Sequence, residues 1–508
     1  MDFFDFNNRL KTFYKVPAFV SFCVIFIASI VIFHIYLGAH FSNDCYHLWF
    51  EIEDFPYQAS SQGRPLTGLI AAFFSSLGIN LVRHQQFFTL IGLLIYSIAV
   101  TCLLETILKL KNDYSVKFRV ISGAVSLMIV FNFFSVDMFH YSVMMLSYSF
   151  SALLTVLASR SILLKQNFSS LIKAVLFLVT AAMFYQSYIT LFVPLVLIGL
   201  LFNSESSLSS RRKLNWCLLS LAGYGAVLVI DYAYIKLVHL KFLGHLWFDA
   251  RTGKPSPILN NLRYIYHIQD DLWINSFGLM NRFYFLIFIC AFVSLFVFYR
   301  SKIKEKISVL FFLASSLTIF YALMMLPHVF SGDIGVSARS ISTFASIPAL
   351  IIFGFIIYQR DWFENTTVKN IGLFLAVGLF LILQIAAINT FGTEGININK
   401  EDGLQARQIV DLVEGYESKS GNKVTDLYFK NDLSPMRCYR PDCYVHAKAL
   451  AISWSRIESI KLYTGRSFNA FEINAEDFAR LFEAKNWDEF IASEQIKFEG
   501  NKGYVLVF

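Results

Sequence analysis

Residues 41–64 concentrate side chains that could act on a substrate. The acids of this segment are Asp44, Glu51, Glu53 and Asp54. A carboxylate that is partly removed from water is a plausible general base, because desolvation raises its pKa and therefore its affinity for a proton. Asp44 comes first after a long apolar run, and we predict that it is the base. The other three acids compete for this role, and a helix cap or a solvated loop acid is the alternative for Asp44 itself.

Two arginines could bind a phosphate. Arg64 follows a glycine and precedes a proline at the start of a second apolar stretch. A guanidinium can pair with two phosphate oxygens at once, so Arg64 is a candidate for binding a phosphate leaving group. Arg339, in a later loop near His328, is a second candidate. The alternative for Arg64 is a side chain that reaches lipid headgroups.

One long apolar run is interrupted by the polar and aromatic sequence Tyr185-Gln186-Ser187. Polar groups at membrane depth are costly and tend to be functional, so Gln186 is a candidate for substrate binding. The alternative is a hydrogen bond between two helices. Asp137 and His140 could belong to the same cavity, or each could cap a helix end.

The chain lacks the common nucleotide, hydrolase and metalloprotease motifs: a Walker loop, a Rossmann glycine fingerprint, a G-x-S-x-G elbow and an H-E-x-x-H pair. It also lacks the Asp-x-Asp with which metal-dependent nucleotide-sugar enzymes hold a diphosphate, and Glu51-x-Glu53 is the nearest match. We therefore expect no metal and no nucleotide at the site.

The composition is that of a polytopic membrane protein. Apolar residues make up 56% of the 508 residues, charged residues 16%, and phenylalanine alone occurs 54 times. Several apolar runs reach the roughly 20 residues that a membrane-spanning helix needs. The fold class is therefore mostly α, a bundle of transmembrane helices. The basic excess, with a net charge of +7, reflects cytoplasmic loops, and no motif for nucleic-acid binding is present.

Lysine and arginine in the short loops orient the spans. The basic start of the chain places the N-terminus in the cytoplasm, and residues 16–38 then form a retained signal anchor that puts residues 39–86 outside. Residues 65–81 are short for a crossing and are expected to lie in the outer interface. Residues 172–202 are too long for one helix and are expected to form a re-entrant hairpin with Gln186 near its outer tip. The prediction is about nine spans plus this hairpin, with a second outer loop at residues 239–282.

The polarity changes after residue 390. Residues 1–390 are the expected membrane domain, and residues 391–508 a small α/β domain outside the membrane. Within that domain we expect helices at residues 401–418 and 476–485 and strands at residues 423–429 and 503–508. Cys438 and Cys443 lie in it, and an oxidising compartment makes a disulfide between them the natural interpretation.

The order of these features resembles the membrane glycosyltransferases of the GT-C type, and more narrowly the phage-type, serotype-converting glucosyltransferases of bacterial O-antigen. Three short stretches carry the resemblance: Asn43-Asp44, Gly63-Arg64-Pro65-Leu66 and Tyr185-Gln186-Ser187. Relatives often have a second acid after the Asn-Asp position, where this chain has Cys45. Asp44 therefore acts either alone or together with Glu51 or Glu53.

The resemblance implies an enzyme of the bacterial inner membrane that transfers glucose from polyprenyl-phosphate-glucose to O-antigen polysaccharide at the periplasmic face. The lipid-linked donor takes the place of a cofactor. Partners would be the bilayer, the donor, the acceptor polysaccharide and, further, a donor synthase and a flippase. The residues expected to bind substrate, besides the base Asp44, are Asn43, Glu51, Glu53, Arg64, Tyr185, Gln186, His328 and Arg339.

Two other functions are consistent with the same features. An O-antigen polymerase or ligase also uses polyprenyl-linked sugars, but its decisive arginines usually lie in large loops in the middle of the chain. A flippase or transporter of such a lipid should carry polar groups through many spans and show internal repeats. The mostly clean apolar spans of this chain favour the transferase.

Overall fold

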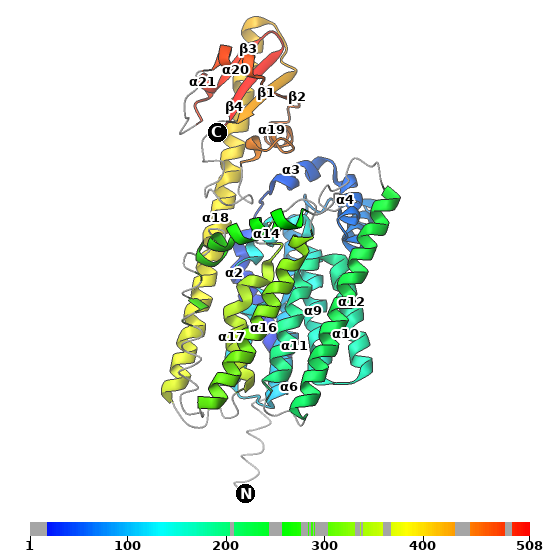
Figure 1. The fold of residues 1–508 in the computed structure, drawn as a ribbon. Helices are drawn as coiled ribbons and strands as arrows, with labels where there is room; N and C mark the ends of the chain where they lie inside the picture. Colours follow the sequence, from blue (N-terminus) through cyan, green and yellow to red (C-terminus); the bar gives the residue numbers. More distant parts are fainter. Residues whose placement is uncertain are drawn as a thin grey trace.

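The computed structural model describes residues 18–203, 208–242, 257–275, 303–330, 339–358, 367–431, 448–482 and 490–507, together with positions 283, 286, 287, 289 and 336. A bundle of helices carries a small α/β domain at one end (Figure 1). The predicted cysteine pair, Cys438 and Cys443, lies outside the described residues.

The bundle is built from long apolar helices. Its helices are α2 (Ala18–Phe33), α6 (Gln85–Lys111), α7 (Val116–Val130), α9 (Met145–Leu164), α10 (Phe168–Phe184), α11 (Phe192–Leu201), α12 (Ser210–Phe242), α16 (Ile303–Val329), α17 (Ile347–Tyr358) and α18 (Thr367–Ser420). Within the described residues, six helices are long and apolar enough to cross a membrane. A helix satisfies its own backbone hydrogen bonds, so it can form in a medium without water. The predicted mostly helical membrane fold is confirmed at this level.

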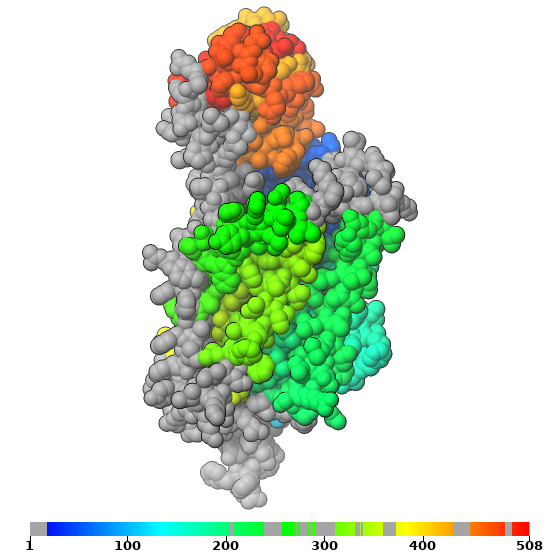
Figure 2. All heavy atoms as spheres, viewed as in Figure 1, coloured from blue at the N-terminus to red at the C-terminus, as the bar shows by residue number. Residues whose placement is uncertain are grey.

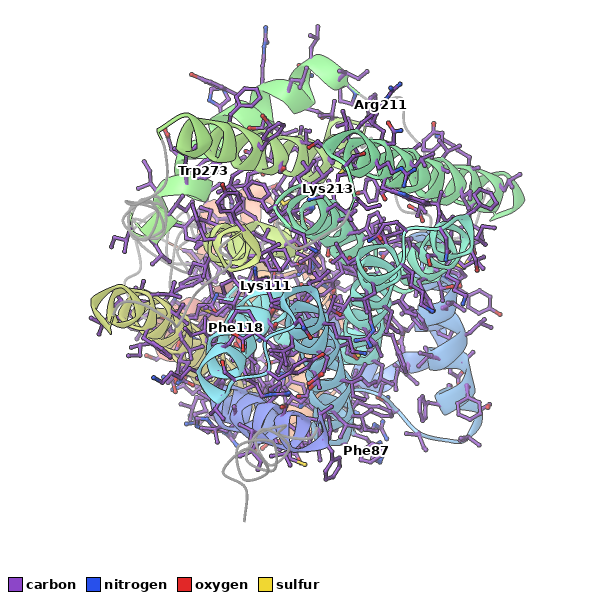
Figure 3. The ribbon with its side chains drawn as sticks, turned by 90° about the horizontal axis from the view of Figure 1, so that it is seen from below. Phe87, Lys111, Phe118, Arg211, Lys213 and Trp273 are labelled. Atoms are coloured by element: carbon purple, nitrogen blue, oxygen red, sulfur yellow. The ribbon has the colours of Figure 1, made fainter. Side chains whose placement is uncertain are left out.

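Apolar side chains fill the interior of the bundle and also lie on its outer surface. Phe118 of α7 is buried, whereas Phe87 of α6 is 58% exposed at the periphery (Figure 3). At the end seen in Figure 3, Lys111 Nζ donates a hydrogen bond to the Ile357 carbonyl and so joins α6 to α17. An apolar outer surface of this kind suits a lipid environment.

We expected a re-entrant hairpin in residues 172–202 with Gln186 near its tip. In the structure this segment holds two helices, α10 and α11, and the break between them lies at Tyr185 and Gln186. α10 ends at Phe184, where the extended backbone of Tyr185 breaks the helix, and the short helix η4 (Gln186–Leu191) leads into α11. Hydrogen bonds tie η4 to η6 (Ser342–Ser346), through the hydroxyls of Ser187 and Ser342 and those of Thr190 and Thr343.

Four short helices lie at the end of the bundle that carries the α/β domain. They are α3 (Asn43–Phe50), η2 (Ile52–Asp54), α4 (Phe55–Ser61) and α5 (Pro65–Ser76). α5 occupies most of residues 65–81 and is shorter than the spanning helices. The Thr67 hydroxyl contacts Ser147 of α9 and the Phe184 carbonyl of α10, which holds α5 against the bundle. In the second predicted outer loop, α14 (Ile258–His267) lies across α16 (Figure 1).

α18 is a single helix of 54 residues that begins in the bundle and ends in the α/β domain (Figure 1). At about 1.5 Å per residue it is roughly 80 Å long. The sequence suggested a last span and a separate amphipathic helix at residues 401–418. In the structure both belong to α18, and the predicted domain boundary at residue 390 falls inside it.

The C-terminal domain packs a four-stranded sheet against the end of α18. The strand order is β2 (Asn469–Glu472), β1 (Asp426–Asn431), β4 (Lys502–Val507) and β3 (Ile496–Glu499). β1 is parallel to β2 and β4, and β3 is antiparallel to β4. The two predicted strands correspond to β1 and β4, and the predicted helix at residues 476–485 corresponds to α20 (Ala475–Leu481). β2, β3, α19 (Arg456–Thr464) and α21 (Ala492–Gln495) were not predicted.

The C-terminal domain rests on the first short helix of the bundle end. α19 packs against α3, and the blue atoms of the N-terminal part are visible beneath the orange atoms of this domain (Figure 2). The Lys461 ammonium lies 4.2 Å from the centre of the Phe50 ring at this junction.

Candidate active site

Arg64 is positioned by the corner between α4 and α5. Gly63 turns the chain there with φ of +82°, and the Gln186 side-chain amide donates to its carbonyl over 3.0 Å. The Gln186 amide oxygen in turn accepts a hydrogen bond from Arg64 Nε over 3.4 Å. The Arg64 guanidinium lies 4.7 Å from the centre of the Tyr185 ring. The structure thus brings together two stretches that are more than 100 residues apart in the sequence.

Arg339 also contacts Tyr185. The Tyr185 hydroxyl donates to the Arg339 carbonyl over 3.2 Å. The Arg339 guanidinium is 3.4 Å from an oxygen of Asp137, and its backbone N–H donates to the second oxygen over 2.8 Å. We call Arg64, Tyr185, Gln186, Asp137 and Arg339 the arginine cluster.

Asp137 is fully buried, whereas the Arg339 side chain is 27% exposed. Burial raises the pKa of the Asp137 carboxyl, and the Arg339 guanidinium opposes this rise by favouring the charged form. Arg339 remains cationic under all ordinary conditions. The arrangement leaves one guanidinium accessible next to a buried counter-ion, which is suited to binding an anion from the exposed side.

Asp44 lies in the first turn of α3, and its Oδ1 accepts a hydrogen bond of 3.2 Å from the indole of Trp454 in the C-terminal domain. Tyr141 packs against the arginine cluster. Its ring lies 3.8 Å from the Arg339 guanidinium, and the charges of Asp44 and Asp137 both act on its hydroxyl. Burial is the main reason why the pKa of Tyr141 is raised, so this phenol stays protonated and able to donate.

The neighbours of Asp44 on α3 are buried and serve packing. Cys45 is fully buried and accepts a hydrogen bond from the Ser42 hydroxyl over 3.1 Å. Asn43, a predicted substrate ligand, is only 9% exposed. Cys45, which stands directly after Asp44, therefore faces the protein interior.

Glu51, Glu53 and His328 belong to other segments than the residues of the arginine cluster. Glu51 and Glu53 are exposed, and Glu51 is 3.7 Å from the His47 imidazole. His328 lies in the last turn of α16, where the neighbouring Val329 carbonyl accepts a hydrogen bond from Asn261 of α14. We do not include these three residues in the site.

One group among the described residues could hold a metal. His47, Glu51 and Asp54 bring one potential ligand atom each within 4.8 Å of one another. Exposed acidic groups of this kind are common on protein surfaces without a bound ion, and Glu51 is 58% exposed. We assign no metal to it.

Sequence reasoning missed three residues of this region. Asp231 of α12 lies near Gln186 and Arg64, and an acid within an apolar run is a signal that could have identified it. Tyr141 and Trp454 had no such signal, because their contacts depend on how distant segments pack.

The comparison with family models gives one match. The family described as Glucosyl transferase GtrII matches residues 50–359, more than half of the chain. The match includes Arg64, Tyr185, Gln186 and Arg339, and it begins after Asp44. No curated protein matches the chain. No solved structure matches it either. With its apolar helices and its cluster of arginines, the chain belongs to the GtrII family of glucosyl transferases and is a glycosyltransferase.

Proposed function

We propose that this enzyme transfers glucose from polyprenyl-phosphate-glucose to O-antigen polysaccharide at the periplasmic face of the inner membrane. The observation that carries the proposal is that Tyr185 contacts both the Arg64 guanidinium and the Arg339 backbone, at the end of an apolar helix bundle. A donor with a phosphate and a long apolar tail needs this combination of charge and apolar surface.

The leaving group is a phosphate. As the bond between the anomeric carbon and the phosphate oxygen breaks, negative charge grows on the phosphate. Arg64 and Arg339 can stabilise that charge, and the protonated Tyr141 phenol beside Arg339 can donate a further hydrogen bond. Two guanidiniums then supply the positive charge that a metal supplies in diphosphate-dependent enzymes, which supports a metal-independent reaction.

The nucleophile is a hydroxyl of the acceptor sugar. Its oxygen attacks the anomeric carbon from the face opposite the phosphate, and its proton goes to the Asp44 carboxylate. One bond forms and one breaks in a single displacement, so the anomeric configuration inverts. The product is the glucosylated polysaccharide, and polyprenyl phosphate is released into the membrane.

The purified full-length enzyme in liposomes tests this proposal. With labelled polyprenyl-phosphate-glucose and O-antigen polysaccharide, label should enter the polysaccharide, and EDTA should leave the rate unchanged. UDP-glucose in place of the lipid donor should give no transfer. Transfer from UDP-glucose, or loss of activity in EDTA that added metal restores, would contradict the proposal.

A further inference from the structure

Trp454 is an exposed aromatic residue that directly contacts the proposed base. It lies in the turn before α19, its side chain is 56% exposed, and its indole N–H donates to Asp44 Oδ1 over 3.2 Å. An exposed tryptophan normally gains stability by covering its apolar face. Here the polar edge of the ring is fixed by Asp44 while the rest stays accessible.

The turn that carries Trp454 is held firmly by its neighbours. The buried Ser455 hydroxyl donates to the Ala449 carbonyl over 2.9 Å, and Arg456 Nε donates to the Leu450 carbonyl over 2.7 Å. Both side chains are buried, Ser455 at 0% and Arg456 at 4% exposure. Trp454 is therefore presented in a fixed place and does not move as part of a loose loop.

The same buried residue positions both Trp454 and Asp44. Asp402 of α18 accepts a hydrogen bond from the Ala449 backbone N–H over 2.9 Å, at the start of the tryptophan turn. Its other oxygen accepts one from the Tyr46 hydroxyl over 3.1 Å, on the helix that carries Asp44. The relative placement of tryptophan and acid is thus set by buried hydrogen bonds that span three segments of the chain.

The chemistry of the reaction indicates which substrate Trp454 contacts. In a displacement with inversion, the base touches the attacking hydroxyl, and the leaving phosphate lies on the opposite face of the anomeric carbon. Trp454 contacts Asp44 directly and comes from the C-terminal domain, whereas the residues of the arginine cluster belong to the helix bundle. A group in direct contact with the base is therefore close to where the attacking hydroxyl of the acceptor binds.

Resting on the function proposed above, we propose that Trp454 forms an acceptor subsite and stacks against a pyranose ring of the polysaccharide. The face of a pyranose that carries axial hydrogens is apolar, and the electron-rich face of an indole complements it. The hydrogen bond from Trp454 occupies Asp44 Oδ1. Within the described residues Oδ2 accepts no hydrogen bond, so it is available to take the proton of the acceptor hydroxyl.

Two substitutions separate stacking from positioning. Trp454→Ala removes the ring and should raise the KM for the acceptor polysaccharide about tenfold, in line with the loss of one aromatic contact. It should leave the KM for the lipid donor unchanged. Trp454→Phe keeps a ring but lacks the N–H, so the acceptor KM should stay within about threefold of wild type. Phe471→Ala, which removes another exposed aromatic residue of the same domain, should change neither constant.

Direct binding keeps this test independent of the donor. The full-length protein is titrated with delipidated O-antigen polysaccharide without donor, and Trp454→Ala should weaken binding about tenfold relative to wild type. If wild type fails to use polyprenyl-phosphate-glucose but Trp454→Ala still weakens binding, the proposed donor is wrong and the subsite stands. Unchanged acceptor binding and KM in Trp454→Ala would overturn the subsite. An equal rise in the KM for the lipid donor would also overturn it, because it would indicate a residue that positions the whole site. A defect that vanishes in detergent micelles would overturn it too, because it would indicate an anchor to lipid headgroups.

Discussion

At the scale of single residues, the site depends on the shape and the hydrogen-bond donors of a side chain as well as on its charge. Arg64 receives support from Gln186 and stacks on Tyr185, which together fix the plane of its guanidinium. A lysine in its place would keep the charge but not the planar pair of donors.

Arg64→Lys should therefore lower the rate of transfer at least about tenfold, through weaker stabilisation of the leaving phosphate. Arg83→Lys is the matched control. Arg83 is an exposed arginine that also stacks on an aromatic ring, Trp49, but lies outside the arginine cluster. Initial rates over a range of donor concentrations measure both variants. Equal effects of the two substitutions would show that Arg64 is only an interfacial anchor.

The sequence made part of this site predictable. Arg64 and Gln186 stood out because a polar group beside or within an apolar run has few structural explanations. Trp454 could not be found in this way, since its contact with Asp44 joins positions 410 residues apart. Asp231 could have been found from the sequence, because it is an acid within an apolar run.

At the scale of elements, the corner between α4 and α5 sets the geometry of the arginine cluster. A Cβ on Gly63 would lie 2.7 Å from Ile235 Cγ1 and 2.9 Å from Gln186 Nε2, and the positive φ is itself unfavourable for other residues. Gly78 has a similar φ of +74°, but a Cβ there would meet nothing within 4 Å.

The two glycines make a matched pair. Gly63→Ala and Gly78→Ala should both cost about 1 kcal/mol of stability from backbone strain. Only Gly63→Ala should also reduce activity strongly, because the clash displaces Gln186 and with it Arg64. Thermal unfolding and transfer rates of both variants measure these effects. A Gly63→Ala enzyme with the activity of Gly78→Ala would show that the corner does not position Arg64.

α3 is joined to the C-terminal domain by buried hydrogen bonds. The Tyr46 hydroxyl contacts Asp402 and also lies 3.1 Å from the Tyr463 hydroxyl. Tyr46→Phe leaves a buried carboxyl with one donor fewer and should cost about 1–3 kcal/mol.

Tyr57→Phe is the control for this substitution, because Tyr57 is 64% exposed. Unfolding of both variants in detergent, followed by near-ultraviolet circular dichroism, measures the difference. A Tyr46→Phe protein as stable as Tyr57→Phe would mean that this junction contributes little to stability.

The short elements of the C-terminal domain were the least predictable. β2 and β3 have four residues each, too few for an alternating pattern to be distinguished from a loop. α18 was divided in the prediction because its composition changes from apolar to mixed at the point where it leaves the bundle. The residue composition of a helix depends on whether lipid, protein or water surrounds it. A change in composition therefore does not show that the helix ends.

At the scale of the whole molecule, the proposal needs the C-terminal domain and the opposite end of the bundle on different sides of the membrane. Asn422, between α18 and β1 of the C-terminal domain, and Arg211, at the start of α12 in Figure 3, are both exposed. A membrane-impermeant maleimide should label Asn422→Cys in spheroplasts, and Arg211→Cys only after the membrane is opened. Labelling of Arg211→Cys in sealed spheroplasts would contradict the proposed orientation.

The central claim is that Asp44 is the base of a glucosyl transfer from a lipid-linked donor. The most direct measurement compares transfer of labelled glucose from polyprenyl-phosphate-glucose by wild type and Asp44→Asn at equal protein levels in membranes. Asp411→Asn, an exposed acid of α18, is the control. The account predicts a loss of about 100- to 10,000-fold for Asp44→Asn, the usual contribution of a general base, and no loss for the control. Transfer by Asp44→Asn at the wild-type rate, or an equal loss in Glu51→Gln, Glu53→Gln or Asp54→Asn, would contradict it.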